Sequence, residues 1–273
     1  MNDYVSLVLK RRFREAEELR IQQIPRTLVK FYSLNEDERL NNKKLNSLRN
    51  EEIWLSSIKA FNDPYEFCGL YVDEEKLKRA DFTADVIGSY KEFIKDSFKK
   101  YAICSLSGNT FDALPMWAYY TNNHKGFCVE YEVINPRYIN KVSYEQQRIP
   151  IASVLSNIFH YTKQLEKHEK IDEEEMAIFS LAYFALYSIK HISWMHEDEY
   201  RLVIPFFMNP NGYCNGFSCR LSAVGLKTSK IVAGLNCGEE YVDKLKTISK
   251  KLECDGFSRL RISENKYTLL EEV

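Results

Sequence analysis

The sequence lacks a long apolar run and an excess of charge of either sign. Its 273 residues hold 38 Lys and Arg against 39 Asp and Glu, a formal charge of −1, and no apolar run reaches the roughly 18 residues that a membrane span needs. The basic stretch at residues 10–14 is not followed by an apolar core, so we expect no secretory signal and no membrane partner. Near-neutral charge argues against a nucleic acid held mainly by long-range electrostatics, although it leaves a local basic groove open. We therefore expect a cytoplasmic protein.

The common signatures of metal and phosphate sites are also missing. No two of the seven cysteines have the spacing of a zinc knuckle, so we interpret them as reduced, mostly buried thiols and predict no metal. The motifs Gly-x-x-x-x-Gly-Lys, Gly-x-Gly-x-x-Gly, His-Glu-x-x-His and Gly-x-Ser-x-Gly do not occur. Their absence argues against a P-loop, a Rossmann dinucleotide fingerprint, a zincin helix and a serine-hydrolase elbow.

What the chain does contain is enough apolar material for a large core, with 45% hydrophobic and 14% aromatic residues. The fold class that we predict is α+β: a mixed or mostly antiparallel central sheet flanked by helices. Residues 1–273 are expected to form one domain, with an N-terminal helix in 1–25 and a helical-pair insertion at 151–192. Further helices are predicted at 36–49, 74–100 and 239–253. Strands are predicted at 27–33, 53–57, 101–107, 127–131, 199–207, 217–224, 230–235, 257–262 and 267–270.

The segment from Met116 to Tyr131 is the densest in aromatic and polar residues. Trp117 and Tyr120 are three residues apart, so a helical turn would place both rings on one face. His124 lies in the polar stretch that follows, and Glu130 lies on a strand of alternating character. Such a corner suits either a planar ligand or a place in the core.

The segment from Trp194 to Arg201 gathers acidic and basic side chains. On a strand, Glu197, Glu199 and Arg201 would share one face. One carboxylate could then bind a ribose hydroxyl while the other draws a proton from a nucleophile, and the arginine would keep both ionised. We therefore take these three as the catalytic candidates. The alternative interpretation is a solvated strand edge with ordinary ion pairs.

Two more segments are candidates for the same site. The sequence Phe61-Asn62-Asp63-Pro64-Tyr65-Glu66 predicts a turn closed by an Asx side chain, and either Asp63 or Glu66 could serve as a pocket acid. On the predicted strand 101–107, Ser105 and Ser107 share a face and could line a nucleotide site.

These blocks, in this order, resemble a large bacterial family that is catalogued as a domain of unknown function, the one numbered twenty-nine seventy-one. The resemblance covers most of residues 28–235, and Tyr119 stands where a histidine is expected. It is carried by Lys30-Phe31-Tyr32-Ser33-Leu34, Ile53-Trp54-Leu55-Ser56-Ser57, the Phe61–Glu66 segment, Cys104-Ser105-Leu106-Ser107, Met116-Trp117-Ala118-Tyr119-Tyr120, His124 to Tyr131, and Trp194 to Arg201.

The order of the motifs is also similar to that of ADP-ribosyltransferases, which split a small mixed sheet around NAD. This resemblance implies that Lys30 holds the cofactor in place of the usual arginine or histidine, and that Ser105 with Ser107 (or residues 56–57) supports the site. It further implies that Glu199 is the catalytic glutamate and that Glu197 orients the acceptor, with Trp117 or Tyr120 stacking on nicotinamide. The remaining residues that we expect at the cofactor are Tyr32, Asp63, Glu66, His124, Glu130 and Trp194.

Three functions follow as hypotheses. The first is an NAD-dependent ADP-ribosyltransferase or NAD glycohydrolase, acting as a bacterial toxin or phage-defence effector. The second is a metal-dependent nucleic-acid- or nucleotide-processing protein that would use Asp63, Glu66, Glu130 and Glu197. The third is a non-catalytic module that senses a ligand. The sequence indicates neither the acceptor nor the oligomeric state.

Overall fold

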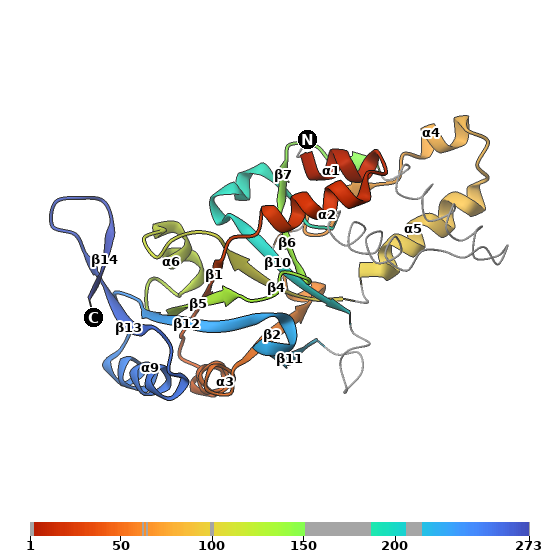
Figure 1. Ribbon diagram of the computed structural model, residues 1–273. Helices are drawn as coiled ribbons and strands as arrows, with labels where there is room; N and C mark the ends of the chain where they lie inside the picture. Colours follow the sequence, from red (N-terminus) through yellow and green to blue (C-terminus); the bar gives the residue numbers. More distant parts are fainter. Residues whose placement is uncertain are drawn as a thin grey trace.

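A ten-stranded, mostly antiparallel sheet forms the centre of the protein and is flanked by helices (Figure 1). The computed structural model describes residues 3–61, 63, 65–98, 101–150, 187–205 and 215–272. Within these residues the fold is a mixed α+β arrangement, which confirms the predicted class. None of the described helices combines the length and the apolar character that crossing a bilayer would require.

The strands of this sheet fall into two groups. The first group, in the order of pairing, is β1 (Thr27–Tyr32), β5 (Phe127–Val133), β12 (Leu226–Ala233), β13 (Gly256–Ile262) and β14 (Leu269–Glu272). The second group is β11 (Gly216–Arg220), β2 (Glu52–Ser57), β4 (Tyr101–Ser107), β10 (Glu199–Pro205) and β6 (Ile139–Lys141). Only β12 and β13 pair in parallel in this sheet, among the described strands.

The two groups meet at a split in the sheet. β1 forms six residue pairs with β5 and β4 forms seven with β10, but β1 and β4 share the single pair Val29–Ser107. β2 joins the far end of β4 through the pairs Ser56–Ile103 and Ser57–Ala102. Between these contacts β1 and β4 diverge, and the backbone there must find other partners. The Lys30 ammonium supplies one by donating to the Ser105 carbonyl at 3.2 Å.

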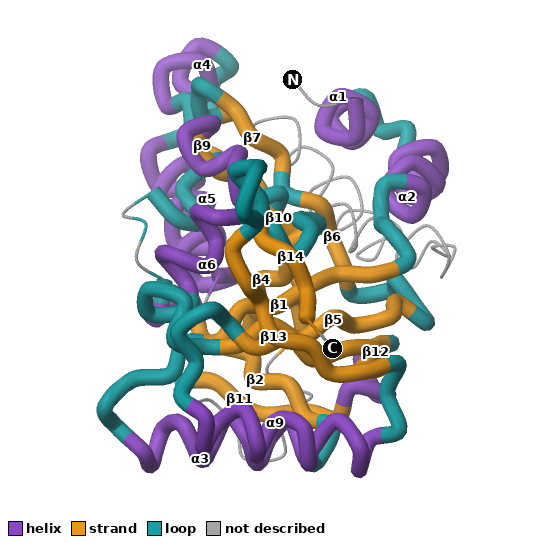
Figure 2. Tube along the Cα trace, turned by 90° about the vertical axis from the view of Figure 1, so that its left-hand side faces the viewer, coloured by secondary structure: helices purple, strands orange, loops and turns teal. Residues whose placement is uncertain are grey.

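Helices cover both faces of the sheet. α3 (Glu38–Arg49) and α9 (Glu239–Leu252) lie side by side on one face, and α6 (Leu114–Tyr120) lies on the other (Figures 1 and 2). Asp37 caps α3 by accepting from the Leu40 amide at 3.2 Å, as the orphan amides of a first helical turn require. The apolar stripe of α9, with Leu245 at its centre, packs into the main core.

The N-terminal and middle helices are each broken where the sequence predicted a continuous helix. Residues 3–22 form α1 (Asp3–Leu9) and α2 (Phe13–Gln22), because Arg11 adopts a φ of 60°. Residues 74–98 form α4 (Glu74–Arg79) and α5 (Ala84–Phe98), with Asp81 at a φ of 62°. A left-handed residue cannot continue a right-handed helix, so both predictions are corrected. These four helices share a second apolar cluster, which we call the satellite cluster: Tyr4, Val5, Val8, Ala16, Leu77, Ile87, Tyr90, Ile149, Tyr187 and Ile189.

Short elements complete the described structure. β3 (Leu70–Tyr71) pairs in parallel with β8 (Ile149–Pro150), and β7 (Ser143–Glu145) pairs in parallel with β9 (Ile189–His191). The 3₁₀ helices are η1 (Ile58–Ala60), η2 (Ile192–Glu197) and η4 (Leu221–Val224).

The structure corrects the predicted bounds of two elements. Residues 189–191 form a strand and not the end of the predicted helical pair, whose residues 151–186 lie outside the described part. The strand predicted at 217–224 ends at Arg220 and continues as a 3₁₀ helix.

Candidate functional site

A cavity of about 340 Å³ opens beside the split, on the side of the sheet that α6 covers. Its polar lining comes from both groups of strands and from α6, and we call it the acidic cavity. The polar side chains that line it are Lys30, Glu66, Ser105, Ser107, Tyr120, Lys190, Glu197 and Glu199. Segments more than 160 residues apart in the sequence therefore meet at one hollow.

Glu199 lies at the start of β10 and is held by three neighbours. Its Oε1 accepts from Ser105 Oγ at 2.6 Å and from Arg201 Nε at 2.9 Å, and its Oε2 lies 3.0 Å from Lys190 Nζ. Arg201 is two residues further along the strand, so the period of two places it on the same face. Only 3% of the Glu199 residue surface is exposed, so these contacts act in a weakly screening environment.

Glu197 reaches the same cavity by a different backbone path from the one that we predicted. It ends η2 and is not on a strand, and Asp198 then takes a left-handed φ of 40° before β10 begins. This turn rotates Glu197 back beside Glu199. Its Oε1 accepts a hydrogen bond from the Tyr120 hydroxyl, and its Oε2 lies 2.6 Å from Lys190 Nζ. The backbone is fixed as well, since Ser107 Oγ donates to the Glu197 carbonyl at 2.6 Å.

Two cations, Lys190 and Arg201, pair with three carboxylates in this buried cluster. Lys190 comes from β9 and lies 3.9 Å from Glu66 Oε2 in addition to its contacts with the glutamate pair. The Arg201 guanidinium bridges Glu66 and Glu199, and it also donates to the Tyr187 carbonyl at 3.3 Å. When all five groups are ionised the cluster carries one net negative charge. Lys30 also lines the cavity and adds a positive charge, so the negative charge is concentrated on the three glutamates and is not a net charge of the whole site.

The protonation of the cluster follows from burial and from these pairs. Burial would raise the pKa of Glu199, but Arg201 and Lys190 outweigh it and lower the pKa to about 2. Burial raises the pKa of Glu66, and Arg201 only partly opposes this. Burial would lower the pKa of Lys190, but Glu199 and Glu197 raise it. At neutral pH, Glu199 is therefore a carboxylate and Lys190 an ammonium ion.

The Tyr120 hydroxyl is a proton donor at neutral pH. Burial raises the pKa of its phenol, and the hydrogen bond to Glu197 raises it further. Of the two rings that the sequence placed on one helical face, Tyr120 is the one that lines the acidic cavity.

Trp117, the other ring, belongs to the core. It is fully buried, its Nε1 donates to the Phe111 carbonyl at 2.7 Å, and its ring meets Phe31 edge-on at 5.3 Å between centroids. The His124 ring stacks on it at 6.3 Å and lines a separate hollow near the C-terminal hairpin. The expectation that Trp117 contacts a cofactor is thus corrected, because no face of its ring is open.

Glu130 also lies away from the acidic cavity. It sits on β5, where it accepts from Ser229 Oγ of the neighbouring strand β12 at 2.7 Å. The hypothesis of a metal site that joins Glu130 to Asp63, Glu66 and Glu197 has no geometric support. In the described ranges no three His, Cys, Asp or Glu side chains are placed to hold a metal ion.

The other predicted residues lie around the site. Asp63 caps its turn, as an Asx residue does, by accepting from the Tyr65 amide at 2.9 Å. The Trp194 ring lies beside the cluster, with Lys190 Nζ 4.8 Å from its centroid. The Tyr32 hydroxyl is 2.7 Å from that of Tyr131, on the other side of the split.

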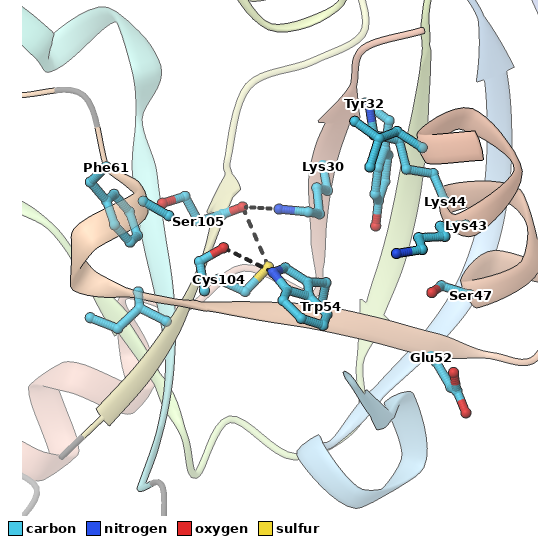
Figure 3. Close-up of a pocket in the computed structure, with 14 residues that line it drawn as sticks. Lys30, Tyr32, Lys43, Lys44, Ser47, Glu52, Trp54, Phe61, Cys104 and Ser105 are labelled. Atoms are coloured by element: carbon cyan, nitrogen blue, oxygen red, sulfur yellow. Dashed lines mark hydrogen bonds between the residues drawn. The ribbon is translucent and has the colours of Figure 1, made fainter. Parts of the chain in front are cut away.

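A second and larger cavity, of about 550 Å³, lies between Tyr32 and α3 (Figure 3). We call it the basic cavity. It lies between α3, β1, β2 and β4, and it shares Lys30, Ala60, Phe61 and Ser105 with the acidic cavity. Its distinctive side chains are Lys30, Tyr32, Lys43, Lys44, Ser47 and Trp54.

Sequence reasoning missed Lys190, Lys43 and Lys44. Lys190 fell in a segment that we took for a helix, and its nearness in sequence to Trp194 and Glu197 was the one local signal. Lys43 and Lys44 precede Ser47 at helical spacing, a pattern that predicts a shared face but is common on solvated helices.

A model of the family described as "Protein of unknown function (DUF2971)" matches residues 116–202. The match confirms the resemblance to this family over residues 116–202, from within α6 through β5 to the start of β10, and leaves the motifs before Met116 as a prediction. No curated protein and no solved structure matches the chain. The matched segment supplies Tyr120, Lys190, Glu197, Glu199 and Arg201, so most of the acidic cluster lies within it.

Proposed function

We propose that the protein is an NAD-consuming enzyme, an ADP-ribosyltransferase or NAD glycohydrolase, with its reaction centre in the acidic cavity. One observation carries the proposal: Lys30, Ser105, Tyr120, Glu197 and Glu199 line a single cavity at the split of the sheet. The order of these residues along the chain is the one that pointed to an ADP-ribosyltransferase. Their meeting at one place is what that hypothesis requires.

The chemistry of the cavity suits cleavage of a bond between ribose and a positively charged base. When such a bond breaks, the base leaves with the bonding electron pair and positive charge develops on the ribose ring. Glu199 remains ionised and is buried, so its charge would stabilise that ring without first having to lose a proton. Glu197 lies next to the Tyr120 hydroxyl and could accept the proton that the attacking hydroxyl or water gives up.

The test is release of nicotinamide from NAD by the purified protein. We expect Glu199→Gln to lower the rate at least a hundredfold, because the carboxylate charge is lost while the shape is kept. Ser105→Ala should lower it roughly tenfold, since Ser105 orients Glu199. Ser229→Ala is the matched control: it removes an equivalent serine–glutamate hydrogen bond, to Glu130, outside the cavity. If the folded wild-type protein neither releases nicotinamide nor labels a macromolecule, the proposal fails.

A second candidate function, a non-catalytic ligand sensor, is favoured by one feature of the cluster. Ser105, Lys190 and Arg201 already occupy both oxygens of Glu199, which is typical of a structural ion network as well. The same assay separates the two. Binding of NAD that Glu199→Gln leaves intact, with no turnover by the wild type, would favour the sensor.

We further propose that the protein acts in the cytoplasm, as a toxin or phage-defence effector. One observation supports this location: the described cysteines are free thiols, as is usual in a reducing compartment. Enzymatic consumption of NAD would starve the cell in which it occurs. The acceptor is either water or a macromolecule, and the labelling arm of the assay distinguishes them.

A further inference from the structure

We infer that the basic cavity is a binding site for a nucleoside diphosphate, with the phosphates on its lysines and the base on Trp54. The proposed reaction does not use Lys43, Lys44 or Trp54. Nothing in the acidic cluster requires them either. Four features of the cavity lead to this inference: its helix face, its exposed ring, its charge and its size.

One face of α3 turns toward the cavity. Leu40, Lys43, Lys44 and Ser47 line it, at positions i, i+3, i+4 and i+7 of the helix. These positions form a single stripe, while the buried Leu45 and Leu48 face the core. Figure 3 shows both ammonium-bearing side chains extending from α3 beside Tyr32. The helix thus presents two lysines and a hydroxyl to one hollow.

The opposite wall is an exposed indole on β2. Ile53 and Leu55 point into the core, so the period of two turns Glu52, Trp54 and Ser56 to the other face. Trp54 is 48% exposed, a large fraction for this residue type. Its Nε1 donates to Ser56 Oγ at 3.1 Å, which fixes the orientation of the ring plane. A fixed, open indole is a stacking surface for a planar base.

The charge of the lining selects an anion. Three lysines and one carboxylate, Glu52, give the cavity two net positive charges. Lys30 donates to the Ser105 carbonyl at 3.2 Å, and Lys44 donates to the Ser33 carbonyl at 2.6 Å. Both contacts are to neutral oxygens, so these two ammonium charges are not consumed by them. Burial lowers the pKa of Lys44, the Asp37 carboxylate only partly opposes that shift, and a phosphate nearby would oppose it further.

The size fits the same class of ligand. A volume of about 550 Å³ lies in the range of sites for small molecules and cofactors. The cavity offers an aromatic wall at one side and ammonium groups at the other, which matches a base linked through ribose to phosphates. A bare phosphate would leave Trp54 unused, and a neutral aromatic would leave the lysines unpaired.

The experiment is titration of the full chain with ADP in a calorimeter at low salt. We expect Lys43→Gln and Trp54→Ala each to weaken binding fivefold to twentyfold. The matched controls are Lys250→Gln, on an exposed site of α9, and Tyr119→Ala, a residue that is 71% exposed and lies outside the cavity. Both controls should bind ADP as the wild type does. Thermal melting of each variant shows that it is folded.

Pyrophosphate provides the second arm. It should bind more weakly than ADP and should be insensitive to Trp54→Ala. Equal binding of the two ligands, both unaffected by that substitution, would overturn the nucleoside part of the inference. Failure of the wild type to bind ADP, or equal binding by Lys43→Gln, would overturn it entirely.

Binding of ADP in the basic cavity does not depend on turnover in the acidic cavity. Glu199→Gln should still bind ADP, so a failed nicotinamide assay and a failed ADP titration are separate outcomes. Because the cavities share Lys30 and Ser105, ADP should also compete with NAD, a consequence that rests on the proposed function.

Discussion

At the scale of single residues, the acidic cluster shows what a short motif can and cannot predict. The sequence predicted that Glu197, Glu199 and Arg201 lie together, because close spacing alone restricts where they can point. The prediction that Glu197 lies on the strand was wrong, because a pattern of charges does not indicate that Asp198 adopts a left-handed conformation. Lys190 was missed because its position depends on β9 pairing with β7, a contact between segments about 45 residues apart. Such pairings are decided by tertiary structure and not by local preference.

The pKa of Glu199 makes a residue-scale prediction about stability. Its folded pKa of about 2 lies below the ordinary value of 4.5, so its ionised form stabilises the folded state above pH 4.5. That contribution is lost as the pH falls toward 2. We expect Glu199→Gln to reduce the free energy of unfolding by about 3 kcal/mol at pH 7, and by much less near pH 2.5. Urea unfolding of both proteins across this range is the measurement.

The control for this titration is Glu132→Gln, an exposed position on β5. Its effect should stay within about 0.5 kcal/mol at every pH. A loss for Glu199→Gln that is the same at pH 7 and pH 2.5 would mean that packing, and not charge, explains the substitution.

At the scale of elements, periodicity predicted the strands and helices that carry a complete apolar pattern. β1, β4, β5, α3 and α9 appear within a few residues of the predicted ranges. The helix breaks at Arg11 and Asp81 were not predicted, because neither residue type indicates a left-handed conformation as strongly as glycine does. β6, β7 and β9 are only three residues long, too short for a period of two to be recognised.

Two glycines give a matched prediction about how elements are joined. A Cβ at Gly126, just before β5, would overlap the carbonyl oxygen of Tyr32 at the end of β1. Gly88 is inside α5, and a Cβ there would meet nothing within 4 Å. We expect Gly126→Ala to lower the free energy of unfolding by more than about 2 kcal/mol, because the backbone at the end of β1 or the start of β5 must move to make room for the methyl group. Gly88→Ala should raise it by about 0.5–1 kcal/mol through helix propensity.

Chemical denaturation of the two glycine variants and the wild type measures both effects. The opposite signs are the test, because the substitution is chemically identical at the two positions. No loss of stability at Gly126 would contradict the close approach of β5 to β1, and a loss at Gly88 would contradict the open space around that position in α5.

At the scale of the whole molecule, two apolar clusters differ in what they support. The main cluster binds both groups of strands to α3 and α9, whereas the satellite cluster joins α1, α2, α4 and α5 beside the sheet. That the chain forms a single domain remains a prediction from its length and composition. Residue patterns alone did not predict the split in the sheet, which only the resemblance to ADP-ribosyltransferases implied, because the split depends on which edges of β1 and β4 fail to pair.

The difference between the clusters predicts the order in which the molecule opens. The smaller satellite cluster contains fewer buried side chains, so its helices should open locally before the sheet unfolds. We expect the amides of Ile87 and Tyr90 in α5 to exchange with solvent deuterium at least tenfold faster than those of Leu202 in β10 and Ile231 in β12. Equal protection at α5 and the sheet would show instead that the satellite cluster and the split sheet unfold as one unit.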